Sequence, residues 1–256
     1  MDIKDFFKKN KNITVALSGG IDSAVLLYLA EKYAENVSAV FVKTEFQPAF
    51  EQETAEKICR ELGLKLDIIN TSVMVYDSIA ENADDRCYHC KKHMFSLICD
   101  YAKGRNSVTS DGTNADDDIA CRPGYRALKE LGVLSPLKIC GYTKADIRKI
   151  AESYNLSVKD KPSYSCLATR IPTGIKITND ILSSTEKAES ELFGYGFSDF
   201  RIRYRNGSAL LELTERDKKR YLLNKRKIDE SLLKYYKEIS LSEETRNGTG
   251  KNPQNT

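Results

Sequence analysis

The sequence predicts an α/β protein in which a parallel β-sheet is sandwiched between helices, followed by a smaller α+β domain. Three features support this fold class. Short apolar runs typical of strands alternate with helical patterns over residues 13–154, which favours a parallel sheet covered on both faces. Polar loops follow the expected strands, at the edge where such sheets bind ligands. Beyond Lys161-Pro162 the pattern changes to a long helix and a hairpin.

The first domain is expected to alternate strand and helix along the chain. Expected strands cover residues 13–17, 37–42, 65–69, 107–110 and 133–137, and expected helices cover 23–33, 54–62, 91–102 and 144–154. Two polar connections stand out among them: the glycine turn after the first strand, and the loop that begins at Asp111.

The second domain carries two clear local signals. An amphipathic helix is expected to begin after Thr178 as its N-cap and to stop at Gly194. Strand-like runs at 200–204 and 209–213 then flank Asn206-Gly207, which is a strong hairpin signal.

Composition limits the classes of partner. We expect domains at residues 1–165 and 166–240, and a disordered polar tail at 241–256 that has nothing to bury. The net charge of +3 is too small to indicate a nucleic-acid partner. No apolar run approaches the roughly 20 residues that a membrane span needs, and residues 1–12 lack the apolar segment of a signal peptide. We therefore expect a cytoplasmic protein with neither a membrane nor a nucleic-acid partner.

A glycine loop between the first strand and the first helix is the strongest candidate binding site. Gly19 and Gly20 let the backbone approach an anion, and the helix that follows offers unpaired N–H groups. Ser18 and Ser23 add hydroxyl donors for phosphate oxygens. Asp22 is expected to bind Mg²⁺ or to orient a backbone amide. An ordinary strand-to-helix turn capped by serine would explain a lone pair of glycines equally well.

Three of the seven cysteines have polar surroundings and need an explanation. Cys87 and Cys90 form a CxxC pair, which places two thiols on one expected loop at a spacing suited to one metal centre. Cys166 supplies a third thiol, and His89 or His93 could complete a zinc site. Three cysteines alone could instead hold a 4Fe–4S cluster and leave one iron open. A redox pair, half a zinc site and two unligated thiols are the other interpretations of the CxxC pair.

The other four cysteines give no indication of a metal site or of a catalytic role. Cys59, Cys99 and Cys140 lie within or beside apolar runs, so we interpret them as small buried hydrophobic residues. Cys121 precedes an Arg-Pro-Gly segment in a loop, and no role is indicated for it.

The glycine loop resembles the SGGxDS signature of the PP-loop ATP pyrophosphatases. A Gly-Lys-Ser/Thr sequence is absent, which argues against a Walker-type site. The segment DGTNADD at 111–117 resembles the family's second loop, and the resemblance implies that Asp111, Gly112 and Asn114 line the site of ATP and its metal. The chemistry that it implies is attack by a substrate oxyanion on the α-phosphorus of ATP, with release of pyrophosphate and adenylation of the substrate.

The likeness becomes specific to the LarE family of sulfur transferases, which help to build a nickel-pincer cofactor. Ordered matches extend from about residue 13 to about residue 213: SGGIDS, DGTNADD, Arg122-Pro123-Gly124, Leu131-Gly132-Val133, SCLATRIP around Cys166, and Arg201-Ile202-Arg203. The resemblance implies that Arg122 contributes to the nucleotide site.

Members of that family adenylate a carboxylate of pyridinium-3,5-biscarboxylic acid mononucleotide and convert it to a thiocarboxylate. In one branch a single cysteine, at the position of Cys166, gives up its sulfur and becomes dehydroalanine. In another branch three cysteines hold a 4Fe–4S cluster and a sulfide on the open iron is passed on. Because this chain also carries Cys87 and Cys90, it is similar to the cluster branch, with Cys166 as the third ligand. The sulfide donor is not indicated.

The expected hairpin carries candidate substrate residues. Arg201, Arg203 and Arg205 alternate along one strand and so share a face, a suitable clamp for a phosphate or carboxylate. A solvated edge strand is the alternative. The family resemblance implies that Glu189 belongs to the substrate pocket. Arg170 and Lys161 flank Cys166 and could lower the pKa of its thiol through their charge, although both could equally lie on the surface.

Two other enzyme classes and one non-enzyme remain as alternatives. One alternative is a thiolase that acts on tRNA or on a small molecule other than the mononucleotide. A tRNA thiolase also pairs such a loop with cysteines, but no RNA-binding module is evident. An amide-forming synthetase would need an ammonia source, and no glutaminase segment is present. Two intact nucleotide-binding loops argue against a degenerate, non-enzymatic nucleotide-binding regulator. We expect a homo-oligomer that acts on a small mononucleotide.

Overall fold

The computed structural model describes residues 1–118 and 123–246. Contacts divide the chain into two compact units, one made of Met1–Ile79 with Ala83–Lys161 and the other of Ala80–Asn82 with the chain from Pro162 onward.

The first unit is built on a parallel sheet of four strands in the order β3-β2-β1-β4. The strands are β1 (Asn12–Ala16), β2 (Asn36–Lys43), β3 (Leu66–Asn70) and β4 (Val108–Ser110). The helices are α1 (Ile3–Lys9), α2 (Ile21–Tyr33), α3 (Ala49–Glu61), α4 (Asp77–Ala80), α5 (Arg86–Lys103), α6 (Pro123–Glu130), α7 (Pro136–Ile139) and α8 (Lys144–Ser153). The predicted fold class is confirmed.

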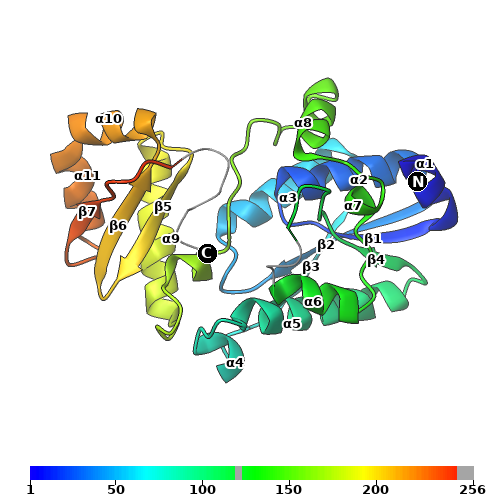
Figure 1. The fold of residues 1–256 in the computed structure, drawn as a ribbon, viewed down its shortest axis with the longest axis horizontal. Helices are drawn as coiled ribbons and strands as arrows, with labels where there is room; N and C mark the ends of the chain where they lie inside the picture. The colour runs from blue at the N-terminus through cyan, green and yellow to red at the C-terminus, as the bar shows by residue number, and fades with distance from the viewer. Residues whose placement is uncertain (119–122, 247–256) are drawn as a thin grey trace. The chain divides into compact units, whose positions relative to one another are not determined.

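Alternate residues of the strands face opposite layers of helices, as the two-residue period of a strand requires. Val15 and Phe41 belong to the core that α1, α2, α3 and α8 complete on one face of the sheet. Val40 and Val42 belong to a second core with α5 and α6 on the other face. Figure 1 shows these two layers of helices with the sheet between them.

The fifth expected strand, at 133–137, is largely wrong. Leu134 forms only a single parallel bridge to Ser110, and the chain then turns into α7. Pro136 explains the difference, because proline has no backbone N–H to continue a ladder and suits the first turn of a helix.

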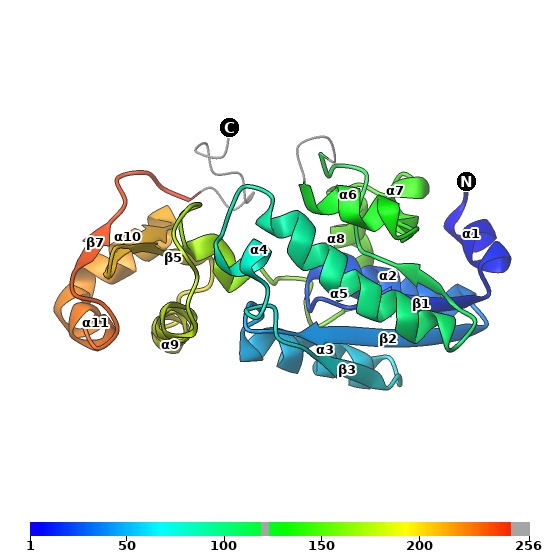
Figure 2. The ribbon, with the colours of Figure 1, turned by 90° about the horizontal axis from the view of Figure 1, so that it is seen from below.

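The second unit is a mixed sheet covered by helices. Its elements are the 3₁₀ turn η1 (Leu167–Arg170), α9 (Asn179–Gly194), β5 (Phe200–Arg205), β6 (Ser208–Leu213), α10 (Glu215–Leu223), α11 (Lys225–Leu232) and β7 (Ile239–Leu241). Strands β5 and β6 are antiparallel, whereas β6 and β7 are parallel. Helices α9, α10 and α11 share one apolar core with the sheet, and Figure 2 views α9 and α11 nearly along their axes.

The hairpin and the helix before it form as predicted. Asn206 and Gly207 connect β5 to β6 with positive φ angles of 49° and 90°, as a two-residue primed turn requires. Thr178 caps α9, accepting a hydrogen bond from the N–H of Ile181 at 3.2 Å.

The chain beyond β7 continues along β6 for several residues. The N–H of Ser242 donates to the carbonyl of Leu211 at 2.9 Å, and that of Arg246 donates to Leu213 at 3.0 Å. The guanidinium of Arg246 also binds Asp199 at 3.0 Å. The tail expected to be disordered thus begins with residues that bond to the sheet, and residues 247–256 lie outside the described part of the chain.

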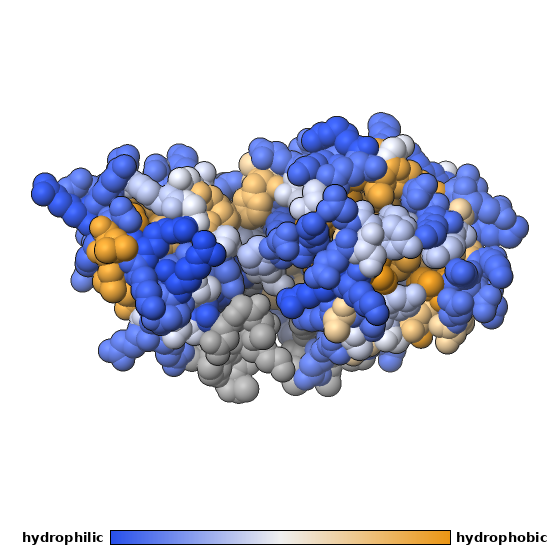
Figure 3. All heavy atoms as spheres, turned by 90° about the horizontal axis from the view of Figure 1, so that it is seen from above, coloured by the Kyte–Doolittle hydropathy of each residue, from blue (hydrophilic) through white to orange (hydrophobic). Residues whose placement is uncertain are grey.

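No helix in the described part of the chain is long and apolar enough to cross a membrane. Figure 3 shows hydrophilic residues over most of the visible face, with smaller apolar areas between them.

Candidate functional site

The glycine loop leads directly from β1 into α2. Gly19 has a φ of +78°, a left-handed conformation that favours glycine. Gly20 then caps α2 in an extended conformation without a side-chain hydrogen bond. The first turn of a helix leaves its N–H groups without partners inside the helix, and the helix dipole makes that end positive. The loop can therefore receive an anion at the start of a helix of 13 residues.

Two serine hydroxyls meet at the start of this helix. The oxygens Oγ of Ser18 and Ser23 lie 3.1 Å apart. The hydroxyl of Ser23 donates to the carbonyl of Gly20 at 3.0 Å and accepts from the N–H of Ser18 at 3.2 Å. Ser23 is buried, so it holds the shape of the loop and keeps the Ser18 hydroxyl beside the glycines.

The second predicted loop lies against the first. A Cβ placed on Gly112 would sit 2.8 Å from the backbone nitrogen of Ser23 and 3.1 Å from the carbonyl carbon of Asp22. Only a glycine fits at such a distance, so the sequence DGTNADD contacts the N-terminus of α2 through its backbone. The structure thus brings together two motifs that are almost 90 residues apart in the chain.

Asp111 organises this second loop through both of its carboxylate oxygens. One oxygen accepts a hydrogen bond from the hydroxyl of Ser135 at 2.6 Å, and the other accepts from the hydroxyl of Thr113. Its N–H donates to the carbonyl of Leu134 at 2.9 Å. Ser135, which the sequence did not indicate, is buried beside it.

Asn114 is fully buried in the same loop, and its side-chain amide nitrogen is a hydrogen-bond donor that the described residues leave without an acceptor. Its Oδ1 accepts from the N–H of Asp116 at 3.0 Å, and its own N–H donates to the carboxylate of Asp117 at 3.1 Å. Its Nδ2 has no hydrogen-bond partner within the described residues. A buried amide donor without a partner is costly, and a ligand bound at this loop would supply one.

Two lysines that contact the loop at residues 111–117 were not predicted from the sequence. The ammonium of Lys138 donates to the carbonyl of Asp117 at 3.1 Å. The ammonium of Lys144 lies 3.8 Å from the Asp117 carboxylate, and its N–H donates to Asp116 at 2.7 Å. No motif links them to the loop, because they approach it through α7 and the start of α8.

Lys161 and Glu51 hold the glycine loop from behind. The Lys161 ammonium donates to the carbonyl of Gly19 at 2.9 Å and to the Glu51 carboxylate at 2.9 Å. Glu51 is buried. The sequence suggests that the charge of Lys161 could alter the pKa of the Cys166 thiol, but the Lys161 ammonium is engaged at the glycine loop instead. Glu51 was not predicted, because a single glutamate in a helix carries no distinguishing signal.

The CxxC pair lies on a helix, which corrects the expected loop. Cys87 and Cys90 fall in the first turns of α5, which begins at Arg86. The positions i and i+3 share a face of a helix, and both thiols are half-buried. A guanidinium nitrogen of Arg86 lies 3.5 Å from the Cys87 sulfur, and the Cys90 thiol lies 3.7 Å from the sulfur of Met94.

Neither histidine lies with the cysteine pair as a zinc ligand would. His89 pairs with Asp85 at 3.1 Å, and the Nε2 of His93 lies 2.9 Å from the hydroxyl of Thr71. Within residues 1–118 and 123–246, no group of three cysteine, histidine or acidic side chains is placed to hold a metal ion. The predicted residues Arg122 and Cys121 lie outside the described residues.

The three remaining cysteines are packed to different extents. Cys59 is buried, as predicted, and burial raises the pKa of its thiol to about 11. Cys99 and Cys140 are only half-buried at the edges of the two cores of the first unit.

In the second unit, Cys166 is the residue that begins the turn η1. Its side chain is half-buried, and its carbonyl accepts from the N–H of Thr169 at 3.0 Å and from the Thr169 hydroxyl at 2.7 Å. The backbone that presents the thiol is therefore held in place on its C-terminal side.

A buried ion pair lies beneath this turn. Arg170, which is 0% exposed, binds both carboxylate oxygens of Glu189, at 2.6 and 3.2 Å. Glu189 also accepts from the hydroxyl of Tyr164 and from the N–H of Ile202 at 3.2 Å. Burial lowers the pKa of Arg170, but the charges of Glu189 and Tyr164 and the hydrogen bond to Glu189 together outweigh burial and raise that pKa overall. Burial and the same carboxylate raise the pKa of Tyr164 far above its usual value.

Arg201 and Arg203 share a face of β5, as their spacing predicts, and both hold the Cys166 segment. Arg201 donates to the carbonyl of Ser163 at 2.7 Å. Arg203 donates to the carbonyl of Thr169 at 2.6 Å and to the Glu212 carboxylate at 2.9 Å. Burial, together with the positive charge of Arg170, lowers the pKa of Arg201 to about 9. It therefore stays charged at neutral pH.

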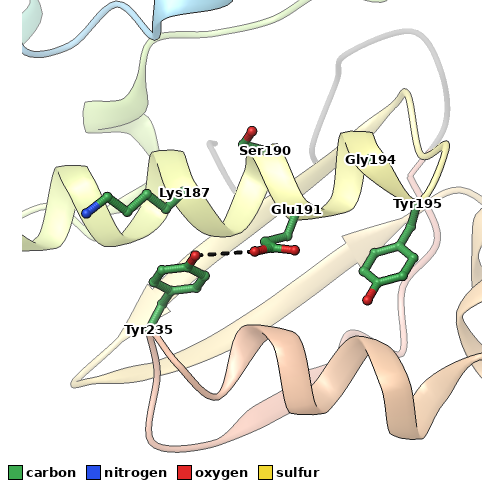
Figure 4. Close-up of a pocket in the computed structure, with 6 residues that line it drawn as sticks. All are labelled: Lys187, Ser190, Glu191, Gly194, Tyr195 and Tyr235. Atoms are coloured by element: carbon green, nitrogen blue, oxygen red, sulfur yellow. Dashed lines mark hydrogen bonds between the residues drawn. The ribbon is translucent and has the colours of Figure 1, made fainter.

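A surface pocket of about 470 Å³ lies elsewhere in the second unit, along α9. The Tyr235 hydroxyl donates to the Glu191 carboxylate across it, at 3.4 Å (Figure 4). None of the predicted site residues lines it; the lining residues are Lys187, Ser190, Glu191, Gly194, Tyr195 and Tyr235.

Known proteins resemble this chain over most of its length. It is 32% identical to the pyridinium-3,5-bisthiocarboxylic acid mononucleotide synthase of Lactiplantibacillus plantarum, over 81% of this chain and 76% of that protein. It is 33% identical to an uncharacterized protein of Methanocaldococcus jannaschii, over 84% and 82% of the two chains. It is 26% identical to the tRNA-specific 2-thiouridylase MnmA of Thermotoga neapolitana, over 80% and 71%.

A family model is consistent with these relatives. The model described as queuosine biosynthesis protein QueC matches residues 12–106, which run from β1 to the end of α5 and include the glycine loop. Together with the two loops that meet at the N-terminus of α2, these likenesses show that the chain belongs to the LarE-like family of PP-loop ATP pyrophosphatases and is an ATP-using sulfurtransferase.

Proposed function

We propose that this enzyme adenylates a carboxylate of pyridinium-3,5-biscarboxylic acid mononucleotide and converts it to a thiocarboxylate, a step of nickel-pincer cofactor biosynthesis. The observation that carries the proposal is the contact of Gly112 with the N-terminus of α2, which joins two ATP loops in a chain that is 32% identical to the synthase named above. The identity of the substrate in this proposal is inferred from the name of that relative.

The residues of the first unit fit an ATP molecule. The N–H groups at the start of α2, with Ser18, Gly19, Gly20 and Ser23, would bind phosphate oxygens. Asn114 offers a buried amide donor that lacks a partner among the described residues. We include Asp111, Gly112 and Arg122 in the same site. Asp111 acts there through the shape of the loop, because both of its oxygens accept from hydroxyls.

Asp22 is proposed to hold Mg²⁺ near the phosphates. It is the acidic residue in the first turn of α2, where a bare carboxylate would repel phosphate unless a cation lay between them. The substrate carboxylate attacks the α-phosphorus, the bond to the β-phosphate oxygen breaks, and pyrophosphate leaves. The acyl adenylate that results is open to attack by sulfur, which releases AMP.

Cys166 is proposed to take part in sulfur delivery. Cys87, Cys90 and Cys166 would together hold a 4Fe–4S cluster, which when bound would supply sulfide to the adenylated carboxylate. The shared helical face and partial burial of Cys87 and Cys90 suit two ligands of one centre.

In the alternative, Cys166 itself is the sulfur donor. Its thiolate displaces AMP to form a thioester. Loss of the Cα proton and cleavage of the Cβ–S bond then leave a thiocarboxylate and a dehydroalanine at position 166.

Glu189, Arg201 and Arg203 are proposed to form the substrate side of the site. Each arginine holds a carbonyl of the segment 163–169, and a guanidinium has five N–H donors. The donors that remain would bind the phosphate or carboxylate of the mononucleotide, while Glu189 sets the charge balance through Arg170. We also propose a cytoplasmic homo-oligomer that receives sulfide from a donor still to be identified.

Modification of tRNA is a second candidate, because the chain is also 26% identical to a tRNA-specific 2-thiouridylase. The two candidates differ in what the enzyme adenylates. ATP–pyrophosphate exchange that needs the mononucleotide and ignores tRNA would support the first, and the reverse would support the second.

The nucleotide site is tested by Asp22→Ala. We expect this variant to lose ATP–pyrophosphate exchange while keeping whatever metal the wild type binds. Undiminished exchange would place the ATP elsewhere.

The sulfur chemistry is tested on protein purified without oxygen. Iron and acid-labile sulfide are measured, with a visible spectrum, for the wild type and for alanine variants at Cys87, Cys90 and Cys166. About four irons and four sulfides per chain, lost in every variant, would support the three-cysteine cluster. Zinc, or no metal, together with a mass loss at Cys166 after one turnover, would support the sacrificial donor.

A further inference from the structure

The ammonium of Lys161 sits directly behind the glycine loop. Within the described residues it contacts the carbonyl of Gly19 at 2.9 Å, the Glu51 carboxylate at 2.9 Å and the Thr54 hydroxyl at 3.4 Å. It also lies 5.2 Å from the centre of the Phe50 ring. Its side chain is 19% exposed and that of Glu51 is 9% exposed. This is a largely buried, mutually neutralised pair, and one of its bonds is to the backbone of the ATP loop.

The backbone around Lys161 holds this side chain in position. The N–H of Lys161 donates to the carbonyl of Val158 at 3.0 Å. Pro162 follows, and a residue before proline is restricted to extended conformations. Lys161 is also the last residue of the first unit. The hydrogen bond to Val158 and the following proline therefore restrict the backbone conformation of Lys161.

Holding the Gly19 carbonyl also sets the direction of the next N–H group. A trans peptide is planar, so its C=O and N–H point in opposite directions. With its carbonyl turned to Lys161, the peptide between Gly19 and Gly20 points its N–H away from the lysine, towards Ser18, whose Oγ lies 3.4 Å from that nitrogen. Left-handed glycine has no side chain to oppose a flip of this peptide. The Lys161 bond opposes it.

We infer that Lys161 is a positioning residue for the phosphates of ATP. It acts through the Gly19–Gly20 peptide, and Glu51 neutralises its charge. The inference rests on the proposal that the loop at residues 18–23 binds ATP. It predicts that loss of Lys161 weakens ligands that carry phosphates and leaves the binding of a nucleoside unchanged.

The test compares the affinities of ATP and adenosine, each measured by calorimetric titration in the presence of Mg²⁺. Lys161→Met removes the donor and also takes the lysine's charge away from the buried Glu51 carboxylate, which can destabilise the fold. The double variant Glu51→Gln with Lys161→Met removes both charges and keeps the volume. Lys57→Met, on the exposed side of α3 with a side chain 58% exposed, is the matched control.

We expect ATP affinity to fall by about tenfold to a hundredfold in the double variant, the range for loss of a charge-assisted hydrogen bond. The double variant should bind adenosine with the affinity of the wild type. The control Lys57→Met should have the unfolding midpoint of the wild type. Equal ATP affinity in wild type and double variant, or an equal fall for ATP and adenosine, would overturn the role of Lys161. Wild-type protein that binds no ATP would instead refute the nucleotide site itself.

Discussion

The two regions that carry the predicted chemistry are built on opposite principles. In the first unit, the nucleotide loop is made of backbone: a left-handed Gly19, a helix N-terminus and a second loop that fits through Gly112. In the second unit, the Cys166 turn rests on charged side chains, above all the buried pair of Arg170 and Glu189. The first region leaves donors open for a ligand, whereas the charges of the second are largely satisfied within the protein.

This difference predicts how each region responds to substitution. Changes in the nucleotide loop should alter its shape, and therefore binding, with little loss of stability. Changes in the network under Cys166 should first cost stability, because a buried charge that loses its partner is expensive.

Arg170→Met should destabilise the second unit most. The substitution leaves the carboxylate of Glu189 buried without its cation, and we expect a loss of about 3–5 kcal/mol in the free energy of unfolding. Urea denaturation measures it. Adding Glu189→Gln should restore a large part of the loss. Arg226→Met, which breaks an ion pair with Glu230 at a side chain 93% exposed, should change stability by less than about 0.5 kcal/mol. Similar losses at the two arginines would contradict the contrast.

Gly112→Ala should damage the nucleotide site without unfolding it. The new Cβ would lie 2.8 Å from the nitrogen of Ser23, so the two loops must move apart. A misplacement near 1 Å can lower a reaction rate about a hundredfold, and we expect a loss of that size in the rate of ATP–pyrophosphate exchange. Gly104→Ala is the control, because its Cβ would meet nothing closer than 3.5 Å. An unchanged rate of ATP–pyrophosphate exchange in Gly112→Ala would show that the contact is not part of the site.

Arg201→Ala combined with Arg203→Ala should separate the two regions in function. We expect sulfur transfer to fall at least about tenfold more than ATP affinity, since each arginine supplies charge-assisted hydrogen bonds at the Cys166 segment. Single-turnover formation of thiocarboxylate and ATP titration measure the two effects. An equal loss of both would mean that the regions do not divide the reaction.

Cys59→Ala should change the pH dependence of stability slightly. Burial raises the pKa of the Cys59 thiol from 9.0 to about 11. Below pH 9 the thiol is neutral in both states, whereas between the two values only the unfolded chain loses the proton, so stability falls as pH rises. The loss at pH 10 is about 1 kcal/mol. Unfolding in urea at pH 8 and pH 10 should show a smaller difference in the variant than in the wild type.

Features that depend on neighbours along the chain could be predicted from the amino-acid sequence alone. The four parallel strands, the Thr178 cap and the turn at Asn206-Gly207 follow from local period and turn chemistry. The loop at residues 18–23 was recognisable because its glycines and serines are consecutive. Local signals failed where periodicity is weak, as at Cys87 and Cys90, whose helical turn carries mixed polar residues and was predicted to be a loop.

Contacts between residues that are distant in the sequence could not be predicted and became visible only in the packed fold. Lys161 bonds to Glu51, which is 110 positions away in the sequence. Arg170 is buried against Glu189. The backbone of Gly112 lies against that of Ser23. Each contact forms because parallel strands bring their loops to one edge of a sheet, or because a buried charge must find a partner. Burial is a property of the whole packed fold, so no local pattern could separate these residues from solvated ones.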